Sequence, residues 1–240
     1  MLRLLLLLLS LLLCPAGPYS LHAQSHESLA LAAYLRSDLS QWDEALAASA
    51  SIPDPETRLL TQAEYQLGKA YAAMAGEDES ARDAAMEAMD DMLDQIWELT
   101  ETNATAHGLY AALLGLKIAR TPMTGMIHGS RASRYVSKGV ALGPDNPAAL
   151  YHAAGNLYYT PEQWGGDPEQ ALRYLQRAIS LYGPDRNQNY RYLAALALLG
   201  QVQAKLDQTD AARATYRMAL EAQPEFHYVS KLLLPRLGVE

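Results

Sequence analysis

The chain contains little cysteine, little phenylalanine and few basic residues for its length. Cys14 is the single cysteine among 240 residues, so no internal disulfide can form and burial of a core must stabilise the fold. Lysine and arginine number 19 against 27 aspartate and glutamate residues, a formal net charge of −8. This balance disfavours nucleic acids and anionic membrane surfaces as partners, because basic patches bind both.

Long apolar runs are also scarce, and the most marked one stands at the N-terminus. Arg3 precedes an apolar stretch from Leu4 to Leu13, and prolines then interrupt the chain before the small residue Ala23. A short positive region, an apolar core and a small residue at the cleavage position are typical of a secretory signal peptide. A bilayer span needs roughly 20 apolar residues, which makes a transmembrane anchor the less favoured interpretation.

We therefore predict a signal peptide over residues 1–23, cleaved after Ala23, and one domain over residues 24–240 in the periplasm or outside the cell. Cleavage would leave 18 basic against 27 acidic residues and no segment for membrane insertion. A lipoprotein signal at Cys14 is a further alternative. It is disfavoured because Leu13 stands where a small residue usually precedes the modified cysteine.

Tyrosine and alanine are abundant. Fifteen tyrosines stand against three tryptophans and one phenylalanine. Alternation of apolar and polar residues, the pattern of a half-buried strand, is lacking, and residues with high helix propensity predominate. The composition predicts an all-α fold.

Internal repetition divides the chain into units of about forty residues. One alanine recurs after each predicted turn at intervals of 40, 47, 39 and 41 residues, at Ala45, Ala85, Ala132, Ala171 and Ala212. The preceding helical segments carry glycines at Gly68, Gly115, Gly155 and Gly200. Small residues let paired helices approach closely, and stacking of neighbouring pairs completes a core that no pair forms alone.

Two units carry a family resemblance. The segment Leu67-Gly68-x-Ala70-Tyr71, followed by Ala85 and Ala88, and the series Gly200, Ala212, Tyr216, Ala219 and Pro224 resemble the tetratricopeptide repeat (TPR). The resemblance extends from about Glu27 to the C-terminus. It implies a right-handed α-solenoid of about five antiparallel helix pairs, and Phe226 to Leu237 are expected to form a C-terminal capping helix. It leaves the function open, because this fold serves many partners.

The stretch TPEQWGGDPEQA, residues 160–171, is predicted to be the turn between the two helices of the fourth unit. Asp167 is the expected N-cap, Pro168 the first helical residue, and Gln170 is placed to return a hydrogen bond to the cap. A phosphate-binding loop is disfavoured because Asp167 would repel an anion. Trp164 is expected to fold back on the helices.

A second extended turn is predicted over Thr121 to Ser130 in the third unit, on the same edge as Thr160 to Asp167. Met123, Met126 and Trp164 can then form the edge of a small apolar pocket. Alternatively, and more simply, the two loops cover each other's apolar surface.

No catalytic or metal-binding pattern stands out. The histidines are scattered without a zinc-binding spacing, and nucleophile elbows and phosphate-binding loops are lacking. Asp90, Asp91 and Asp94 form the polar face of an amphipathic helix. We predict no enzyme activity, no metal and no cofactor.

The TPR resemblance implies that the first helix of each pair lines a concave groove. The positions that it assigns to this groove are Tyr34, Tyr65, Lys69, His152, Asn156 and Tyr159. Tyrosines with a few polar neighbours suit an extended peptide or a flat ligand. The main hypothesis is a scaffold that binds a protein or peptide in this groove. The alternative is a periplasmic small-ligand-binding protein that assists transport.

Overall fold

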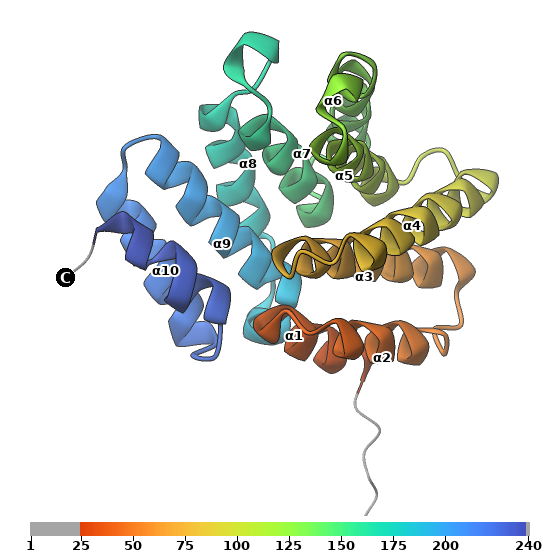
Figure 1. Cartoon of the computed structure of the whole chain (residues 1–240), viewed down its shortest axis with the longest axis horizontal. Helices are drawn as coiled ribbons and strands as arrows, with labels where there is room; N and C mark the ends of the chain where they lie inside the picture. Colours follow the sequence, from red (N-terminus) through yellow and green to blue (C-terminus); the bar gives the residue numbers. More distant parts are fainter. Residues whose placement is uncertain (1–24, 239–240) are drawn as a thin grey trace, which may run out of the picture.

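A computed structural model describes residues 25–238, and within this range every regular element is helical (Figure 1). The predicted signal peptide and its cleavage site lie outside the described residues. The α-helices are α1 (His26–Arg36), α2 (Leu39–Ser49), α3 (Pro55–Ala75), α4 (Glu79–Leu99), α5 (Ala104–Arg120), α6 (Gly125–Leu142), α7 (Pro147–Tyr159), α8 (Pro168–Ser180), α9 (Tyr190–Lys205) and α10 (Thr209–Ala222). No helix in this part of the chain is both long and apolar enough to cross a membrane.

Consecutive helices form five pairs, from α1 with α2 to α9 with α10, as the repeat predicts. Local sequence explains where the helices begin. Asp54, Asn103 and Asn146 each accept a hydrogen bond from a backbone N–H of the first turn of α3, α5 and α7. The all-α prediction with about five helix pairs is confirmed.

Two of the predicted glycine contacts are close approaches between neighbouring helices. A Cβ at Gly68 would lie 2.5 Å from the Trp42 ring, and one at Gly200 would lie 2.1 Å from the Tyr216 ring. Gly115 has nothing within 4 Å of such an atom, so the prediction of a close contact there is wrong. In the third unit the close approach is made instead by Gly139, whose Cβ would lie 3.0 Å from the Ala104 carbonyl oxygen.

Gly200→Ala is expected to lower the free energy of unfolding by about 1–3 kcal/mol, because the new methyl group overpacks the contact with the buried Tyr216 ring. Gly115→Ala is the matched control. It adds the same methyl group to a helix interior with open space and should stabilise by about 0.5–1 kcal/mol. Urea unfolding followed by circular dichroism checks both, and equal effects would contradict the packing assignment.

The first and last helix pairs contact each other, so the pairs form a closed arrangement. α1 packs against α9, and a single buried cluster joins α1, α2 and α3 to α9, α10 and the C-terminal segment (Figure 1). The Tyr34 ring centroid on α1 lies 5.2 Å from that of Phe226 and 5.7 Å from that of Tyr190. The first pair of the predicted helical array is therefore in contact with the last.

The C-terminal segment is less regular than the predicted capping helix. A six-residue π-helix spans Tyr228–Leu233, and a 3-10 turn over Pro235–Leu237 follows. The Leu234 N–H donates to the Val229 carbonyl at 3.0 Å, one residue further back than in an α-helix. Pro235 has no backbone N–H to continue the helical hydrogen bonds, which limits a regular helix here. Phe226 is fully buried, so the segment still covers the end of the last pair.

The turn between α7 and α8 leads into α8 at the predicted cap residue, but not every predicted contact is present. The Asp167 carboxylate accepts from the Gln170 N–H at 2.8 Å, and Gly165 has a φ of 93°, which favours glycine. The Gln170 side chain accepts from Arg173 instead of returning a bond to the cap. Trp164 does not fold back, because it is 74% exposed.

The other predicted extended turn is mostly helical. A 3-10 turn at Pro122–Thr124 leads directly into α6, which begins at Gly125. This end of α6 and the α7–α8 turn lie at the same end of the molecule, the top of Figure 1. Met123 and Met126 are 89% and 91% exposed. The expectation that the two loops cover each other's apolar surface is therefore wrong.

Candidate functional site

Tyrosines from four elements distant in the sequence gather around one space. We call this set the tyrosine face: Tyr34 on α1, Tyr71 on α3, Tyr151 and Tyr159 on α7, and Tyr228 in the C-terminal segment. Their phenol groups are close enough to affect each other's ionisation. Burial, and then the nearby phenols of Tyr34, Tyr71 and Tyr159, raise the pKa of Tyr151 well above its usual value. The contact between α1 and α9, which closes the five helix pairs into a ring, brings these elements together.

Further phenols continue the face. Burial, followed by the phenols of Tyr71 and Tyr228, raises the pKa of Tyr159. Tyr158 and Tyr216 also contribute to this shift, and Tyr182 contributes to that of Tyr151. Such mutual effects need short separations, so these phenols continue the same surface.

The tyrosine face is in contact with water on one side, and protein surrounds its phenols on the other sides, as in a concave surface. Tyr71 is 44% exposed, yet burial by surrounding protein raises its pKa to about 12. Both observations hold together where water reaches a side chain from one side and several helices surround it on the others. Tyr159 shows the same combination, with 66% exposure and a raised pKa. A concave surface is where small ligands bind.

The hydroxyl groups of the tyrosine face have no partner within residues 25–238. In that range, hydrogen bonds to tyrosine hydroxyls are made by Tyr65 with His26 and by Tyr110 with Arg131. The five phenols of the face therefore retain their full capacity to donate and accept. Aromatic rings with free hydroxyls offer a large apolar contact and a few directional bonds to a bound molecule.

Two cations border the tyrosine face. Lys205 Nζ donates to the Tyr158 carbonyl oxygen at 3.1 Å and lies 5.1 Å from the Tyr158 ring centroid. Arg236 is near enough to Tyr228 to lower its pKa, against the larger opposing effect of burial. These side chains can hold acidic groups of a ligand at the margin of the face.

Only some of the residues predicted for the groove lie on this face. Tyr34 and Tyr159 are brought together, as the shift of the Tyr34 pKa by Tyr159 shows, after burial and Tyr228. Tyr65 is fully buried, and its hydroxyl lies 2.8 Å from His26 Nδ1. Lys69 forms an ion pair with Asp43 of α2.

The two remaining predicted groove residues lie on α7. His152 is buried beside Gly108 of α5. A Cβ atom added at Gly108 would lie 3.0 Å from the Cβ atom of His152. Asn156 is half-buried one turn further along.

Sequence reasoning missed Tyr71, Tyr151 and Tyr228. The sequence contains a signal for Tyr71, which follows Gly68 by three residues. Tyr158 follows Gly155 by the same interval in a later unit, so the position recurs. The excess of tyrosine over phenylalanine was another, since a purely structural core gains nothing from fifteen hydroxyl groups.

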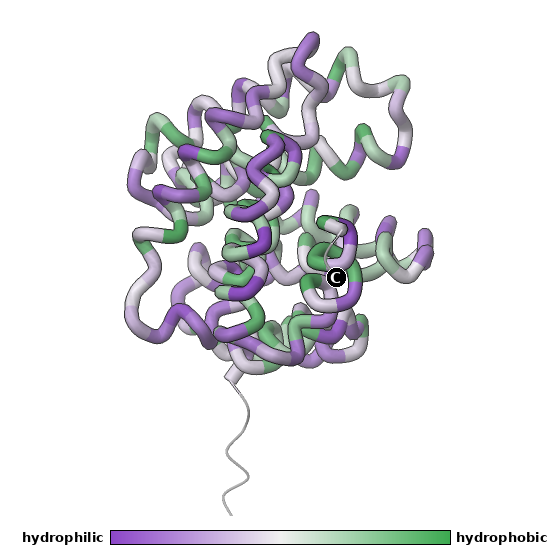
Figure 2. Tube along the Cα trace, turned by 90° about the vertical axis from the view of Figure 1, so that its left-hand side faces the viewer, coloured by the Kyte–Doolittle hydropathy of each residue, from purple (hydrophilic) through white to green (hydrophobic). Residues whose placement is uncertain are grey.

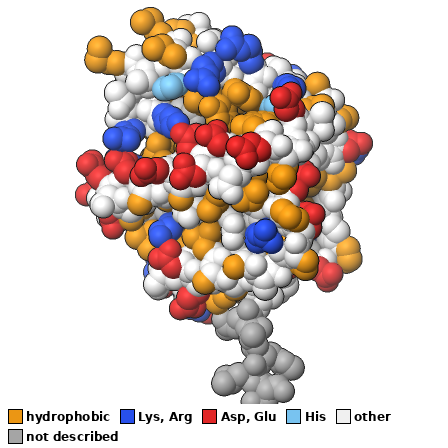
Figure 3. All heavy atoms as spheres, turned by 90° about the vertical axis from the view of Figure 1, so that its right-hand side faces the viewer, with side chains coloured by type: hydrophobic (Ala, Val, Ile, Leu, Met, Phe, Trp, Pro, Cys, Tyr) orange, Lys and Arg blue, Asp and Glu red, His pale blue; other side chains and the backbone are white. Residues whose placement is uncertain are grey.

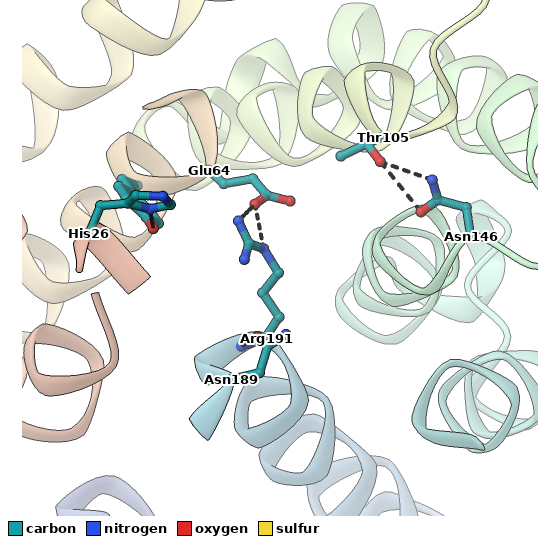
Figure 4. A network of polar contacts seen from close by, with 7 residues as sticks. His26, Glu64, Thr105, Asn146, Asn189 and Arg191 are labelled. Carbon is teal, nitrogen blue, oxygen red and sulfur yellow. Dashed lines mark hydrogen bonds and ion pairs between the residues drawn. The ribbon is translucent and has the colours of Figure 1, made fainter. Parts of the chain in front are cut away.

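An open hollow of about 300 Å³ lies beside an ion pair between α3 and α9. Glu64 and Arg191, which line this hollow, point toward each other from the two helices (Figure 4). Thr105 and Asn146 bond to each other nearby, at 3.1 Å. An adjoining hollow of about 260 Å³ shares Arg191. Because the two charges satisfy each other, we assign this region a structural role.

The predicted pocket edge stands apart from both hollows, since Met123, Met126 and Trp164 line neither of them. Within residues 25–238, no group of three or more His, Cys, Asp or Glu side chains is placed to hold a metal ion.

Comparisons with known proteins give a likeness of fold. No family model matches the sequence, and no curated protein matches it. Among solved structures, the chain is similar to the HusA haemophore from Porphyromonas gingivalis, with a TM-score of 0.54 and 19% identity. The match covers 75% of this chain and 92% of that chain. At this identity the likeness shows the helical, repeat-like fold alone.

Proposed function

We propose that this chain is an exported helical-repeat protein of TPR type that binds a flat, mainly apolar small molecule on the tyrosine face. The observation that carries this proposal is the gathering of five phenols without protein partners from α1, α3, α7 and the C-terminal segment. Tyrosines bury much area at little entropic cost and orient a ligand through their hydroxyls. The proposed role is binding rather than catalysis, in the periplasm or outside the cell, as an accessory to transport.

A porphyrin such as haem is the ligand class that best fits this face. A haemophore shares the fold, which supports the choice. A porphyrin is flat and aromatic and carries two carboxylates at one edge. Stacking on tyrosine rings matches the first property. Lys205 and Arg236 at the border of the face match the second.

The protonation of the phenols indicates which part of the porphyrin is recognised. Burial raises the pKa of Tyr71 to about 12 and raises that of Tyr159 as well, so both remain neutral phenols at neutral pH. A neutral phenol is a weaker ligand for ferric iron than a phenolate. We therefore expect iron-free protoporphyrin to bind within about threefold of the haem affinity. Fluorescence titration of protoporphyrin beside absorbance titration of haem checks this, and loss of binding without iron would place an iron ligand on the chain.

The proposal is tested by titrating haem against the chain and its Tyr71→Ala/Tyr159→Ala variant. The double variant is expected to bind at least about tenfold more weakly, because two exposed rings of the face are removed. Tyr71→Phe/Tyr159→Phe keeps the rings and separates their contribution from that of the hydroxyls. Leu99→Ala/Leu142→Ala removes comparably exposed apolar side chains elsewhere and controls for nonspecific adsorption. Equal affinities of all variants would overturn the proposal.

A protein or peptide is the second candidate, because the TPR resemblance implies such a partner for the groove to which it assigns Tyr34 and Tyr159. Ring closure disfavours it, since α1 packs against α9 and the inner face does not continue past these helices. An envelope protein retained by the wild type and lost by the Tyr71→Ala/Tyr159→Ala variant, without porphyrin binding, would favour this candidate and overturn the small-ligand proposal.

A further inference from the structure

The third helix pair differs in charge from the rest of the chain. Between Thr102 and Pro144 the sequence contains no aspartate or glutamate, although the whole chain has a formal net charge of −8. The same stretch carries five cations, which are Lys117, Arg120, Arg131, Arg134 and Lys138. Although the net charge of the whole chain is negative, α5 and α6 therefore carry a local basic surface.

An apolar tip lies next to these cations. Met123, Met126 and Ile127 stand where α5 turns into α6 and are 89%, 91% and 66% exposed. The two methionines are the most exposed large apolar side chains in the described part of the chain. Methionine is unbranched and polarisable, and it is often used where an apolar surface must adapt to what it contacts.

The fold uses only part of the basic surface. Lys117 and Arg120 form ion pairs with aspartates of α4, and Arg131 donates to the Tyr110 hydroxyl at 3.1 Å. Arg134 and Lys138 are exposed and form no ion pair with any residue in 25–238. Their charges are available to a partner.

Figure 3 shows the order of apolar, basic and acidic side chains on one face of the molecule. Apolar side chains gather at its upper end, basic side chains lie below them, and a band of acidic side chains lies lower still. This order of apolar, basic and acidic layers matches the order of environments at the surface of a bilayer. Apolar groups enter the acyl boundary, cations lie at the level of the lipid phosphates, and acids remain in water.

We propose that the α5–α6 tip docks on an anionic lipid surface, with Met123, Met126 and Ile127 inserted and Arg134 and Lys138 at the lipid phosphates. The charge of the lipid surface is complementary to this basic layer, which has no acidic residue between Thr102 and Pro144, and the net negative charge of the chain favours an orientation with the tip toward the membrane. A protein partner fits less well, because a stable protein interface buries roughly 800 Å² on each side. The tip offers three exposed large apolar side chains and lines neither hollow near Arg191.

The test is cosedimentation with vesicles of phosphatidylcholine containing phosphatidylglycerol and with vesicles of phosphatidylcholine alone. The chain from Gln24 onward is used, because it retains every described helix and lacks the apolar stretch from Leu4 to Leu13, so any lipid binding comes from the described domain. We expect binding to the anionic vesicles that falls as salt is raised. Arg134→Gln/Lys138→Gln should weaken it about thirtyfold, and Met123→Ser/Met126→Ser at least about tenfold.

Arg217→Gln/Met218→Ser on α10 is the matched control, because it removes one exposed cation and one exposed methionine outside the tip and should not change binding. Three outcomes would overturn the proposal. These are absence of binding to anionic vesicles, equal binding of the tip variants and the wild type, and binding to polyglutamate but not to vesicles. The last outcome would assign the surface to an acidic protein.

Discussion

Replacing Arg191 with methionine is expected to lower the free energy of unfolding by about 3–5 kcal/mol, because the Glu64 carboxylate is left buried without a counter-charge. Glu64 is 9% exposed, and Arg191 donates to one of its oxygens from both Nε and Nη2. Burial by itself lowers the pKa of Arg191, but the attraction of Glu64, the hydrogen bond to it and the phenols of Tyr190 and Tyr65 together raise it. The pair joins α3 to α9 across 127 residues of sequence.

Urea unfolding of three variants separates the pair from a general loss of charge. Glu64→Leu/Arg191→Met removes both charges and should cost less than Arg191→Met alone. Arg177→Met breaks the exposed ion pair with Asp145, where both side chains are more than half in water, and should cost under about 1 kcal/mol. If Arg191→Met cost no more than Arg177→Met, the Glu64 pair would have no part in closing the ring.

The features that sequence predicted correctly depend on neighbours in the chain. Asp167 and Pro168 begin a helix through contacts within one turn, so their sequence order is sufficient. Gly68 and Gly200 admit aromatic rings from adjacent helices, and repeat spacing identifies both. Gly115 shows the limit of that reasoning. It follows the repeat spacing, but it faces open space, and Gly139 of α6 makes the close approach in this pair instead.

Ring closure was not predictable, because it joins elements at opposite ends of the sequence. The resemblance to TPR predicts contacts between neighbouring pairs, whereas contacts of Tyr34 with Tyr190 and Phe226 connect the first pair to the last. This closure also buries Tyr65, which the repeat register assigns to the groove. Trp42 and Tyr190, at 5.7 and 6.0 Å between ring centroids, enclose it from two sides.

The candidate site was partly predictable for the same reason. Tyr34 and Tyr159 follow from their repeat positions, because each lies on the first helix of a pair. Tyr228 joins them only because an irregular C-terminal segment returns toward α1 and α10. The tyrosine face therefore depends on closure as much as on the repeat, and variants that loosen α1 from α9 should also weaken ligand binding.

Lowering the pH from about 7 to about 4 is expected to destabilise the wild type more than His152→Gln, by up to about 3 kcal/mol. His152 is 8% exposed. Burial, and then the positive charge of Arg191, lower its pKa from 6.5 to about 4. The unfolded chain binds a proton at this histidine below about pH 6.5, while the folded chain resists it until about pH 4. Stability is therefore complete above the unfolded pKa and is lost as the pH falls between these values.

Urea unfolding at several pH values across this range, on the wild type and His152→Gln, measures the difference directly. His107, whose pKa burial also lowers, is present in both proteins, so its contribution cancels. His227→Gln, at an exposed position, should behave as the wild type does. A difference that does not change with pH would show that His152 is not held neutral by the fold. Because Arg191 contributes to the low pKa, the effect of His152→Gln should be smaller in the Arg191→Met background, which links this prediction to the ion pair that closes the ring.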